Sequence, residues 1–384
     1  MKILIATDSF KGSISAKEAA ESIYRGVVKA CPESEVTKFA LSDGGEGLVE
    51  CLVAATGGEL IVKNVTDPMG KKLNAAFGLL GDGKTVVIEM ASASGLLLIP
   101  EEYRDPLVAT SFGTGELIKA ALDEGCSKII LGLGGSATND GGSGMVQALG
   151  AKLLKKDGSP IPFGGKALLE LHSIDISNLD HRLKKVEIQA ACDVDNILTG
   201  KLGASHVFGP QKGANSKSVL ELDRSLKHFA NIIKRDLKQD VEFMPGAGAA
   251  GGVGASVVAF LQGKLTSGIN LVIEAVGLKE HLNDCDLVIT GEGKLDAQSA
   301  YGKVPIGVAR LAKEYDVPVI AVAGNVYNED DCLAFHNKGI TAYFSIINEP
   351  MSLDAAMGKG AYLLEFTTNQ LIKLFCAGYW KKPM

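Results

Sequence analysis

The sequence predicts an α/β protein with two domains, in which a domain built on a parallel sheet is interrupted by a second, mixed α/β domain. The 384-residue chain is longer than a single hydrophobic core usually supports. Strand-like and helix-like segments alternate over residues 1–60 and again from about residue 266, which is typical of a parallel sheet. Between these regions, strand-like runs separated by tight turns indicate an antiparallel meander.

The interrupted domain has clear local signals at its helix ends. A capping box at Ser15 and Glu18 begins the first helix, because each side chain can satisfy a free backbone amide of that helix end. Gly57 and Gly58 end the second helix, since glycine readily adopts the left-handed conformation found there. The expected elements are strand 2–7, helix 15–30, strand 36–41 and helix 48–56, and later strand and loop 286–293, helix 306–315 and strands 318–325 and 341–347.

The inserted region begins with a meander and ends with a glycine-rich helix. The expected elements are strands 60–67, 72–80 and 85–91, helix 113–124, strand 128–133, a glycine loop, helix 145–154, strand 186–192 and helix 216–237. They are followed by the glycine-rich segment 245–255, which leads into a buried helix. The simplest organisation is a discontinuous Rossmann-like domain, 1–60 plus 266–384, with 61–265 inserted as a mixed α/β domain. Two independent sequential domains are the alternative.

Composition and charge exclude several functions. The net charge is −6 and the chain has no basic block, so nucleic acid is not an expected partner. The sequence contains no run of 18 apolar residues, no secretory signal and no Cys-x-x-Cys or His-Glu-x-x-His motif. We therefore expect a cytoplasmic protein with reduced cysteines, no membrane contact and no zinc site.

The stretch GLLGDGKT, from Gly78 to Thr85, matches the P-loop pattern of nucleotide-binding proteins letter for letter. A functional P-loop follows a strand and begins a helix, whereas here strand-like residues lie on both sides. Asp82 and Gly83 between two such runs are typical of a hairpin turn. We therefore predict a β-hairpin with Lys84 near its tip and no phosphate contact.

Two other glycine-rich segments are candidate ligand loops. Residues 246–251 fit the dinucleotide pattern G-x-G-x-x-G, but Pro245 stands where the motif requires a strand. Residues 132–144 follow a strand and precede a helix, so their amides and polar side chains suit a triphosphate with magnesium. The GxGxxA-like segment 132–137 leaves an NAD-dependent oxidoreductase as an alternative. The candidate nucleotide-binding residues are Gly134, Gly135, Ser136, Thr138, Asn139, Asp140 and Gly141.

Acidic residues follow several of the predicted strands. Ligands of open parallel sheets bind beyond the carboxyl ends of the strands. Acids that cluster there need a cation, such as magnesium or a lysine, to offset their repulsion. Together with the glycine loop, these residues supply the parts that phosphoryl transfer requires. The acids are Asp8, Asp43, Glu46, Asp193, Asp195, Glu292 and Asp296, and the lysines in the same loops are Lys11, Lys212 and Lys294.

Taken in order, these motifs resemble the type 1 bacterial glycerate kinase family. The resemblance implies phosphorylation of D-glycerate by MgATP to 2-phosphoglycerate, in a fold of two α/β domains with the active site in the cleft between them. Thr7 departs from the family, which usually has proline before the first aspartate. The segments that carry the resemblance are DSFKGSISA (8–16), SDGGEG (42–47), IEMASASGL (88–96), RDPLVATSFGTGELI (104–118), GLGGSATNDGGSGMVQALGA (132–151), FGPQKGA (208–214), PGAGAAGGVGA (245–255) and TGEGKLDAQSAYGKVPIGVA (290–309).

The chemistry of such a kinase suggests a role for each charged residue. We expect Asp193 to accept the proton of the glycerate hydroxyl, with Asp8 or Asp296 as the next choice. Lys11 is expected to neutralise the substrate carboxylate or the transferring phosphate. Asp43 and Glu292 are the expected magnesium ligands. The candidate substrate-binding residues are Asp8, Ser9, Lys11, Lys212 and Asp296.

Overall fold

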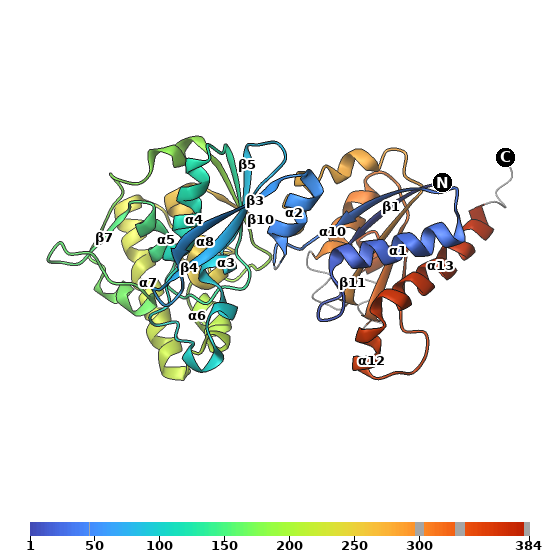
Figure 1. The fold of residues 1–384 in the computed structure, drawn as a ribbon. Coiled ribbons are helices and arrows are strands. Elements are labelled where there is room, and N and C mark those ends of the chain that lie inside the picture. Colours follow the sequence, from blue (N-terminus) through green and yellow to red (C-terminus); the bar gives the residue numbers. More distant parts are fainter. Residues whose placement is uncertain (46, 296–302, 327–334, 380–384) are drawn as a thin grey trace. The chain divides into compact units, whose positions relative to one another are not determined.

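The computed structural model describes residues 1–45, 47–295, 303–326 and 335–379. The chain forms two compact units, each of which has its own sheet (Figure 1). Unit 1 comprises Met1–Asp43 and Ile269–Met384, and unit 2 comprises Gly44–Gly268. Both units mix helices with parallel strands, so the fold is α/β as predicted.

Unit 1 is built on a parallel sheet with the strand order β13-β12-β11-β1-β2. The central strand β11 pairs with β1 on one side and with β12 on the other. Its strands are β1 (Lys2–Thr7), β2 (Glu35–Ala40), β11 (Leu287–Leu295), β12 (Val319–Val326) and β13 (Ala342–Ser345). Its helices are α1 (Ala16–Ala30), α9 (Gly268–Ala275), η6 (Leu278–His281), α10 (Val304–Lys313), α12 (Leu353–Gly358) and α13 (Gly360–Tyr379).

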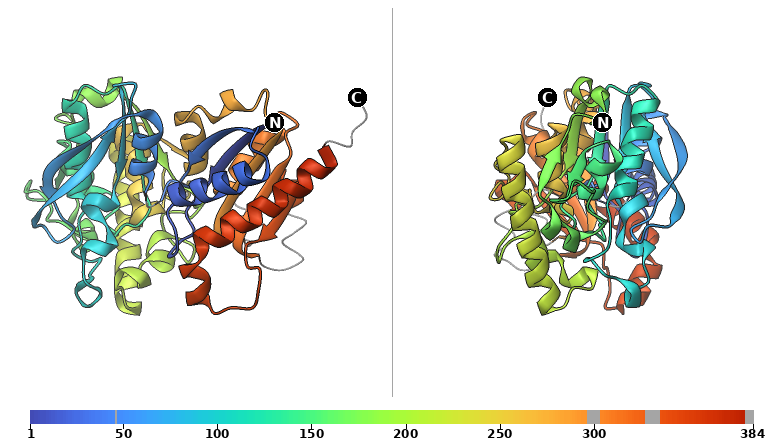
Figure 2. Two further views of the ribbon diagram at one scale, coloured as in Figure 1. Left: turned by 45° about the vertical axis from the view of Figure 1, so that its right-hand side comes forward. Right: turned by 90° about the vertical axis from the view of Figure 1, so that its left-hand side faces the viewer.

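Helices α1 and α13 lie side by side although they come from opposite ends of the chain (Figure 2). Gly26 permits this close approach, because a Cβ at that position would lie 2.6 Å from the carbonyl oxygen of Glu365. Arg25 Nε also forms an ion pair of 2.7 Å with Glu365. The predicted capping box of α1 is confirmed, with Ser15 and Glu18 each accepting a hydrogen bond from the other's backbone amide.

Unit 2 is built on a mixed sheet with the strand order β10-β9-β6-β5-β4-β3. Strands β3, β4 and β5 are antiparallel, as the predicted meander requires, whereas β5, β6, β9 and β10 run parallel. The strands are β3 (Glu59–Thr66), β4 (Lys72–Leu79), β5 (Thr85–Glu89), β6 (Lys128–Gly132), β9 (Glu187–Ala191) and β10 (Lys264–Thr266), with a separate ribbon of β7 (Lys152–Leu154) and β8 (Ser173–Asp175).

The helices that the sequence predicts in unit 2 are present with one exception, and several short helices occur in addition. Helix 145–154 was expected, but α5 ends at Ala148 and residues 152–154 form strand β7. Gly150 interrupts the helix at a φ of +101°. The helices are α2 (Leu48–Thr56), α3 (Ala91–Ser94), η1 (Leu96–Leu98), η2 (Glu101–Tyr103), α4 (Phe112–Asp123), α5 (Ser143–Ala148), η3 (Gly165–Glu170), η4 (His181–Lys185), α6 (Ala204–Phe208), η5 (Pro210–Lys212), α7 (Ser216–Leu237) and α8 (Ala249–Leu261).

Helix α2 belongs to unit 2, whereas the sequence groups it with residues 1–60. It contacts β4 and β5, and the absence of a side chain at Gly78 leaves room for Val53, whose Cγ2 would lie 2.4 Å from a Cβ there. The Glu89 carboxylate at the end of β5 accepts a 2.5 Å hydrogen bond from the amide of Leu48 at the start of α2. Because of these contacts, the chain first passes from unit 1 to unit 2 after residue 43, and not after residue 60 as expected from the sequence.

The P-loop-like stretch is a hairpin, as predicted. Strands β4 and β5 pair antiparallel, with Leu79 opposite Val86. Asp82 closes the turn, because its Oδ1 accepts hydrogen bonds of 2.8 Å from the amides of Lys84 and Thr85. Lys84 is exposed at this turn.

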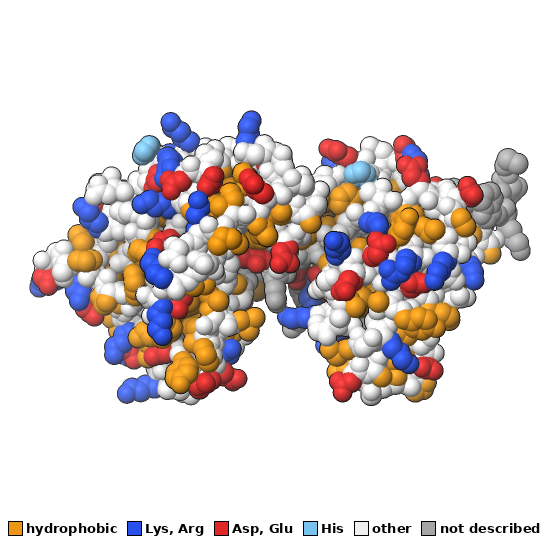
Figure 3. Space-filling view, viewed as in Figure 1, with side chains coloured by type: hydrophobic (Ala, Val, Ile, Leu, Met, Phe, Trp, Pro, Cys, Tyr) orange, Lys and Arg blue, Asp and Glu red, His pale blue; other side chains and the backbone are white. Residues whose placement is uncertain are grey.

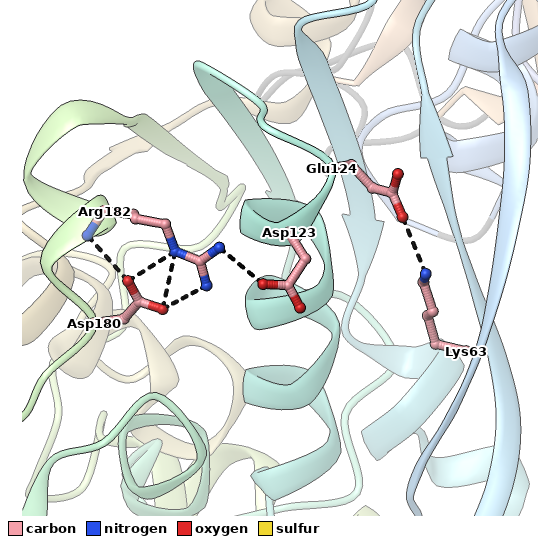
Figure 4. Close-up of polar contacts among 5 residues, drawn as sticks. All are labelled: Lys63, Asp123, Glu124, Asp180 and Arg182. Carbon is pink, nitrogen blue, oxygen red and sulfur yellow. Dashed lines mark hydrogen bonds and ion pairs between the residues drawn. The ribbon is translucent and has the colours of Figure 1, made fainter.

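Ion pairs on the surface of unit 2 connect neighbouring elements (Figure 4). Arg182 in η4 pairs at 2.7 Å with Asp180 and at 2.8 Å with Asp123 at the end of α4. Lys63 on β3 pairs with Glu124 at 3.0 Å. These side chains are partly exposed, so each pair stabilises the fold by about 1 kcal/mol or less.

Acidic and basic side chains are interspersed over the surface shown in Figure 3. Among the described residues, no helix has the length and apolar character needed to cross a membrane.

Candidate active site

Three carboxylates of unit 1 follow the ends of adjacent parallel strands. Asp8 follows β1, Glu292 lies within the last residues of β11, and Asp43 comes shortly after β2. The amide of Asp8 donates a 2.9 Å hydrogen bond to the carbonyl oxygen of Gly291, which aligns the ends of β1 and β11. On the other side, the amide of Leu41 donates to the carbonyl oxygen of Thr7 at 2.9 Å. The sheet order therefore brings together three of the predicted acids.

The electrostatics of Asp8 reflect this grouping. Burial is the largest cause that raises the pKa of the Asp8 carboxyl, and the neighbouring Asp43 and Glu292 raise it further. The amide of Ser9 opposes the shift by donating a 2.6 Å hydrogen bond to Asp8 Oδ1. The net pKa is about 7. Because desolvation and like charge both disfavour the carboxylate form, a cation at this end of the sheet would favour it.

Lys303 adds a cation that the sequence analysis did not single out. It directly precedes α10, and its Nζ lies 3.6 Å from Oε2 of Glu292. Glu292 is only 5% exposed, so the lysine compensates a charge that has little solvation by water. The sequence contains Lys303 within a quoted motif, but only the packing of α10 against β11 brings it to this acid.

Lys11 and Ser9 lie in the turn that follows β1. The turn closes through the amide of Phe10, which donates to the carbonyl oxygen of Ile14 at 2.9 Å. Lys11 is exposed, and its backbone nitrogen lies beside Gly293, where a Cβ would be 3.2 Å from it. The structure thus places Ser9 and Lys11 next to the ends of β1 and β11, as predicted. Asp296, the remaining acid predicted for substrate binding, lies outside the described residues.

The glycine loop of unit 2 has an outer and an inner part. Gly134 and Gly135 are exposed, and Gly135 has a φ of +71°, a conformation that favours glycine. The carbonyl oxygen of Gly135 accepts from the amide of Leu96 at 2.8 Å, and the amide of Ala137 donates to Ser94 at 2.9 Å. Within the part of the chain that the structure describes, the amides of Gly134, Gly135 and Ser136 donate to no protein acceptor. The outer loop therefore has three consecutive amides without a protein acceptor, two of them on exposed glycines and one on Ser136, which is 6% exposed, and such amides suit an anion.

The inner part of the loop is buried and occupied with internal contacts. Thr138, Asn139 and Asp140 are 0% exposed, and Asn139 Nδ2 donates to Ser205 Oγ at 2.9 Å. The amide of Gly141 donates to the carbonyl oxygen of Gly251 at 3.0 Å. Residues 138–141 are thus buried in this structure, and the expectation that they present groups to a nucleotide stays a prediction.

Asp140 explains why the inner loop is closed. Its Oδ2 accepts from the amide of Ser111 at 2.9 Å, from Ser111 Oγ at 2.8 Å and from the amide of Gly144 at 3.2 Å. Its Oδ1 accepts from the amide of Gly142 at 3.0 Å. This carboxylate accepts hydrogen bonds from the amides of Gly142 and Gly144 at the start of helix α5. It therefore stabilises the loop, and its oxygens do not face a ligand.

Lys212 lies beneath the glycine loop and is 2% exposed. Its Nζ donates to Ser136 Oγ at 2.8 Å and to the carbonyl oxygen of Thr138 at 2.7 Å. Burial lowers the pKa of this amine to about 7, and the charge of Asp140 only partly opposes the shift. Lys212 was expected among the substrate-binding residues, with Asp8, Ser9 and Lys11, but its contacts belong to the glycine loop of unit 2.

The second glycine-rich segment packs behind this loop. A Cβ at Gly251 would lie 2.0 Å from the carbonyl oxygen of Thr138, so only glycine fits there. Ala250, Gly251 and Gly252 all have left-handed backbone conformations, and no strand precedes them. The G-x-G-x-x-G match at 246–251 therefore reflects close packing and is not a dinucleotide fingerprint.

Asp193 lies in unit 2, shortly after β9. The residue is exposed, and its Oδ1 accepts a 2.9 Å hydrogen bond from the amide of Gly268. This hydrogen bond fixes the carboxylate beyond the end of the parallel strands β9 and β10. Asp193 is thus accessible to a ligand, in contrast to Asp140 and Lys212.

The described residues contain no preformed metal cage, since no three His, Cys, Asp or Glu side chains among them lie close enough together to hold an ion. Magnesium in kinases usually takes one or two protein carboxylates together with nucleotide phosphates. Asp43 and Glu292, which lie near the ends of β2 and β11 on either side of β1, remain the predicted ligands for that limited role.

Comparisons with known proteins agree with this architecture. The model of the glycerate kinase family matches residues 3–376. The chain is 55% identical to glycerate 2-kinase of Escherichia coli (strain K12) over 94% of each chain, and 51% identical to glycerate kinase of Bacillus subtilis (strain 168) over 97% of each. A crystal structure of the glycerate kinase 2 candidate from Salmonella typhimurium LT2 superposes with a TM-score of 0.90 at 49% identity, covering 99% of both chains.

The fold is thus that of an α/β kinase. The chain is a member of the glycerate kinase family. The alternative of an NAD-dependent oxidoreductase that uses segment 132–137 is not supported.

Proposed function

We propose that the protein is a cytoplasmic glycerate kinase that transfers the γ-phosphate of ATP to D-glycerate and forms 2-phosphoglycerate. The observation that carries this proposal is the similarity over the full chain to relatives named glycerate kinase and glycerate 2-kinase. The three available amides of Gly134, Gly135 and Ser136 support it independently, because consecutive free amides are a common cradle for phosphate groups.

The nucleotide phosphates bind, in this proposal, to the outer part of the glycine loop. Gly134, Gly135 and Ser136 contribute amides, and Ser136 can also contribute its hydroxyl. Thr138, Asn139, Asp140 and Gly141 support the loop from within, in agreement with their burial. This division refines the predicted nucleotide site: its outer residues contact phosphate, and its inner residues hold them in position.

The carboxylates of unit 1 serve substrate and metal in the proposal. Asp43 and Glu292 would ligate the magnesium ion of MgATP, which stabilises the negative charge on the transferring phosphate. Lys11 and Ser9, in the exposed turn after β1, would bind the anionic groups of glycerate. Lys303, paired with Glu292, is a further cation at these strand ends.

Transfer forms a bond between the 2-hydroxyl oxygen of glycerate and the γ-phosphorus and breaks the bond between that phosphorus and the ADP oxygen. The hydroxyl proton must leave, and we assign Asp193 to accept it. Its exposure and its fixed orientation through Gly268 support this assignment. Asp8 is the second candidate because of its place among the strand-end acids.

The test measures ADP release with MgATP, with and without D-glycerate. ADP release that depends on glycerate is expected, and none would contradict the proposal. Stabilisation by NAD but not by MgATP in thermal melts would also overturn it. Asp193→Asn should lower kcat by about 100-fold or more with an unchanged melting temperature. If Asp193→Asn keeps its turnover and Asp8→Asn loses it, the base assignment moves to Asp8.

A further inference from the structure

The buried lysine of unit 2 has an unusual set of partners. The Nζ of Lys212 donates to one hydroxyl and one carbonyl oxygen, both of which are neutral groups. No carboxylate in the described part of the chain lies within ion-pair distance of it. A charged amine without an anionic partner is costly in a protein interior. The site would therefore be more stable if a negative charge were to bind nearby.

The acid that interacts electrostatically with Lys212 already accepts hydrogen bonds from other groups. Asp140 acts on Lys212 electrostatically, but its two oxygens accept hydrogen bonds from Ser111, Gly142 and Gly144. Other ionisable side chains on segments around η5 are His206 on α6 and Arg104, whose carbonyl oxygen lies against Gly213. Arg104 Nε donates to the carbonyl oxygen of Ile99. None of these groups supplies the missing anion.

Ser136 connects the buried amine to the outer loop. The ammonium group donates to Ser136 Oγ, so that oxygen acts as an acceptor toward the lysine and its own proton is available to donate elsewhere. Ser136 is itself 6% exposed and directly follows the exposed Gly134 and Gly135, whose amides donate to no protein acceptor among the described residues. Thr138 Oγ1, on the same loop, is buried and has no hydrogen-bond partner among the described residues. The polar groups around the lysine are therefore incompletely satisfied without a ligand.

We propose that Lys212 is a positioning residue for the nucleotide phosphates: from beneath the loop it directs the Ser136 hydroxyl outward and supplies the positive charge that a phosphate on the outer amides requires. The inference rests on the proposed nucleotide role of the loop. It assigns Lys212 to a phosphate of ATP, not to the carboxylate of glycerate.

A bound phosphate also changes the protonation of the lysine. In the free protein, burial lowers the pKa of Lys212 to about 7. A phosphate above Ser136 favours the charged amine and raises that pKa, so binding takes up a proton when the pH is above 7. Affinity for phosphate should accordingly fall as the pH rises through 7 in the wild type. A lysine with a purely structural role would not produce this dependence.

The experiment measures the dissociation constants of MgADP, tripolyphosphate and D-glycerate by calorimetry at several pH values between 6.5 and 8.5. The variants are Lys212→Met, which removes the charge, and Ser136→Ala, which removes the hydroxyl. Lys217→Met is the matched control, because Lys217 is exposed on α7. Melting temperatures verify that each variant is folded.

We expect Lys212→Met and Ser136→Ala to bind MgADP and tripolyphosphate about 10- to 100-fold more weakly, the range typical of one hydrogen bond to a charged group. Lys217→Met should bind like the wild type. The difference in affinity between wild type and Lys212→Met should shrink as the pH rises, and taking this difference cancels the titration of the ligand itself. Ser136→Ala retains the lysine and therefore tests the connection even if Lys212→Met does not fold.

The outcomes separate this inference from the proposed function. If the wild type binds neither MgADP nor tripolyphosphate, the nucleotide role of the loop is wrong. If the wild type binds both and Lys212→Met binds them equally well with the same pH profile, the inference is wrong and the proposed function stands. If Lys212→Met loses affinity only for D-glycerate, the lysine belongs to the substrate site instead.

Discussion

The two units place their key charges in opposite situations. In unit 1, Asp8 lies near two other acids, and burial together with their charges raises its pKa from 3.8 to about 7. In unit 2, Lys212 is surrounded by neutral acceptors, and burial lowers its pKa from 10.5 to about 7. One site gathers negative charge, and the other holds a buried amine whose hydrogen-bond acceptors are neutral. A magnesium ion and a nucleotide phosphate have charges opposite to those of these two sites.

The candidate residues of the two units also differ in their exposure to solvent. Lys11 and Asp193 are exposed, whereas Asp140 and Lys212 are buried and form hydrogen bonds with the glycine loop. Residues of the same type in similar glycine-rich loops therefore differ in exposure, and for this reason we propose different roles for them.

Asp140→Asn should have the largest effect, because the asparagine amide would direct a donor group toward the donors of Ser111 and Gly144. We expect a loss of about 3–5 kcal/mol in the free energy of unfolding, as for other buried charged groups that lose their partners. MgADP binding should be lost as well. Urea denaturation measures the first and calorimetry the second. Asp157→Asn, at an exposed turn, is the control and should change neither by more than about 0.5 kcal/mol.

Asp8→Asn should stabilise the protein at neutral and alkaline pH. The folded-state pKa lies above the unfolded value, so the folded wild type holds a proton between pH 4 and 7 that the unfolded chain has released. The stability of the wild type therefore falls as the pH rises through this window. The variant should lack this slope and be more stable at pH 8, by roughly 4 kcal/mol. Identical slopes for both proteins in urea denaturation would show that Asp8 is not perturbed.

Lys212→Met should remove a dependence of stability on pH that has the opposite sign to the effect of Asp8 and occurs at higher pH. Between pH 7 and about 10, the unfolded chain keeps the lysine proton that the folded protein has released. The stability of the wild type should therefore rise with pH in this window, by roughly 4 kcal/mol, and that of the variant should not. If the stability of the wild type and of the variant depended on pH in the same way, the lysine would be well solvated or paired. The contrast between the two units would then be wrong.

Lys84→Ala should have the smallest effect. Lys84 is exposed at the hairpin between β4 and β5, where Asp82 organises the turn through backbone amides. We expect kcat and KM for ATP within about twofold of the wild type, as is usual for an exposed side chain without a ligand contact. A loss of 100-fold in kcat would restore the P-loop interpretation of residues 78–85.

The sequence was sufficient for the fold class, the capping box of α1 and the hairpin at 78–85, because these depend on local patterns. It was also sufficient to associate Asp8, Asp43 and Glu292, since parallel strands end at one edge of a sheet. It was not sufficient to assign α2 to the correct unit, because that assignment depends on the contact between Val53 and Gly78 in unit 2. Nor did it distinguish the inner from the outer glycine loop, because that depends on which amides Asp140 occupies.

Lys212 and Lys303 show the same limit for charged residues. The sequence places Lys212 in a loop with other candidate ligands, but only packing shows that it is buried beneath Ser136. Lys303 has no distinctive local signal, and its pairing with Glu292 follows from the position of α10. Long-range packing decides which neighbour a lysine meets.

The most direct test of the proposed reaction couples the product to enolase without a phosphoglycerate mutase. Purified protein, MgATP and D-glycerate are incubated with enolase, and phosphoenolpyruvate is followed by its ultraviolet absorbance. We predict phosphoenolpyruvate formation in step with ADP release, because 2-phosphoglycerate is the substrate of enolase. ADP release without phosphoenolpyruvate would mean that a different hydroxyl is phosphorylated, and no ADP release at all would contradict the kinase assignment.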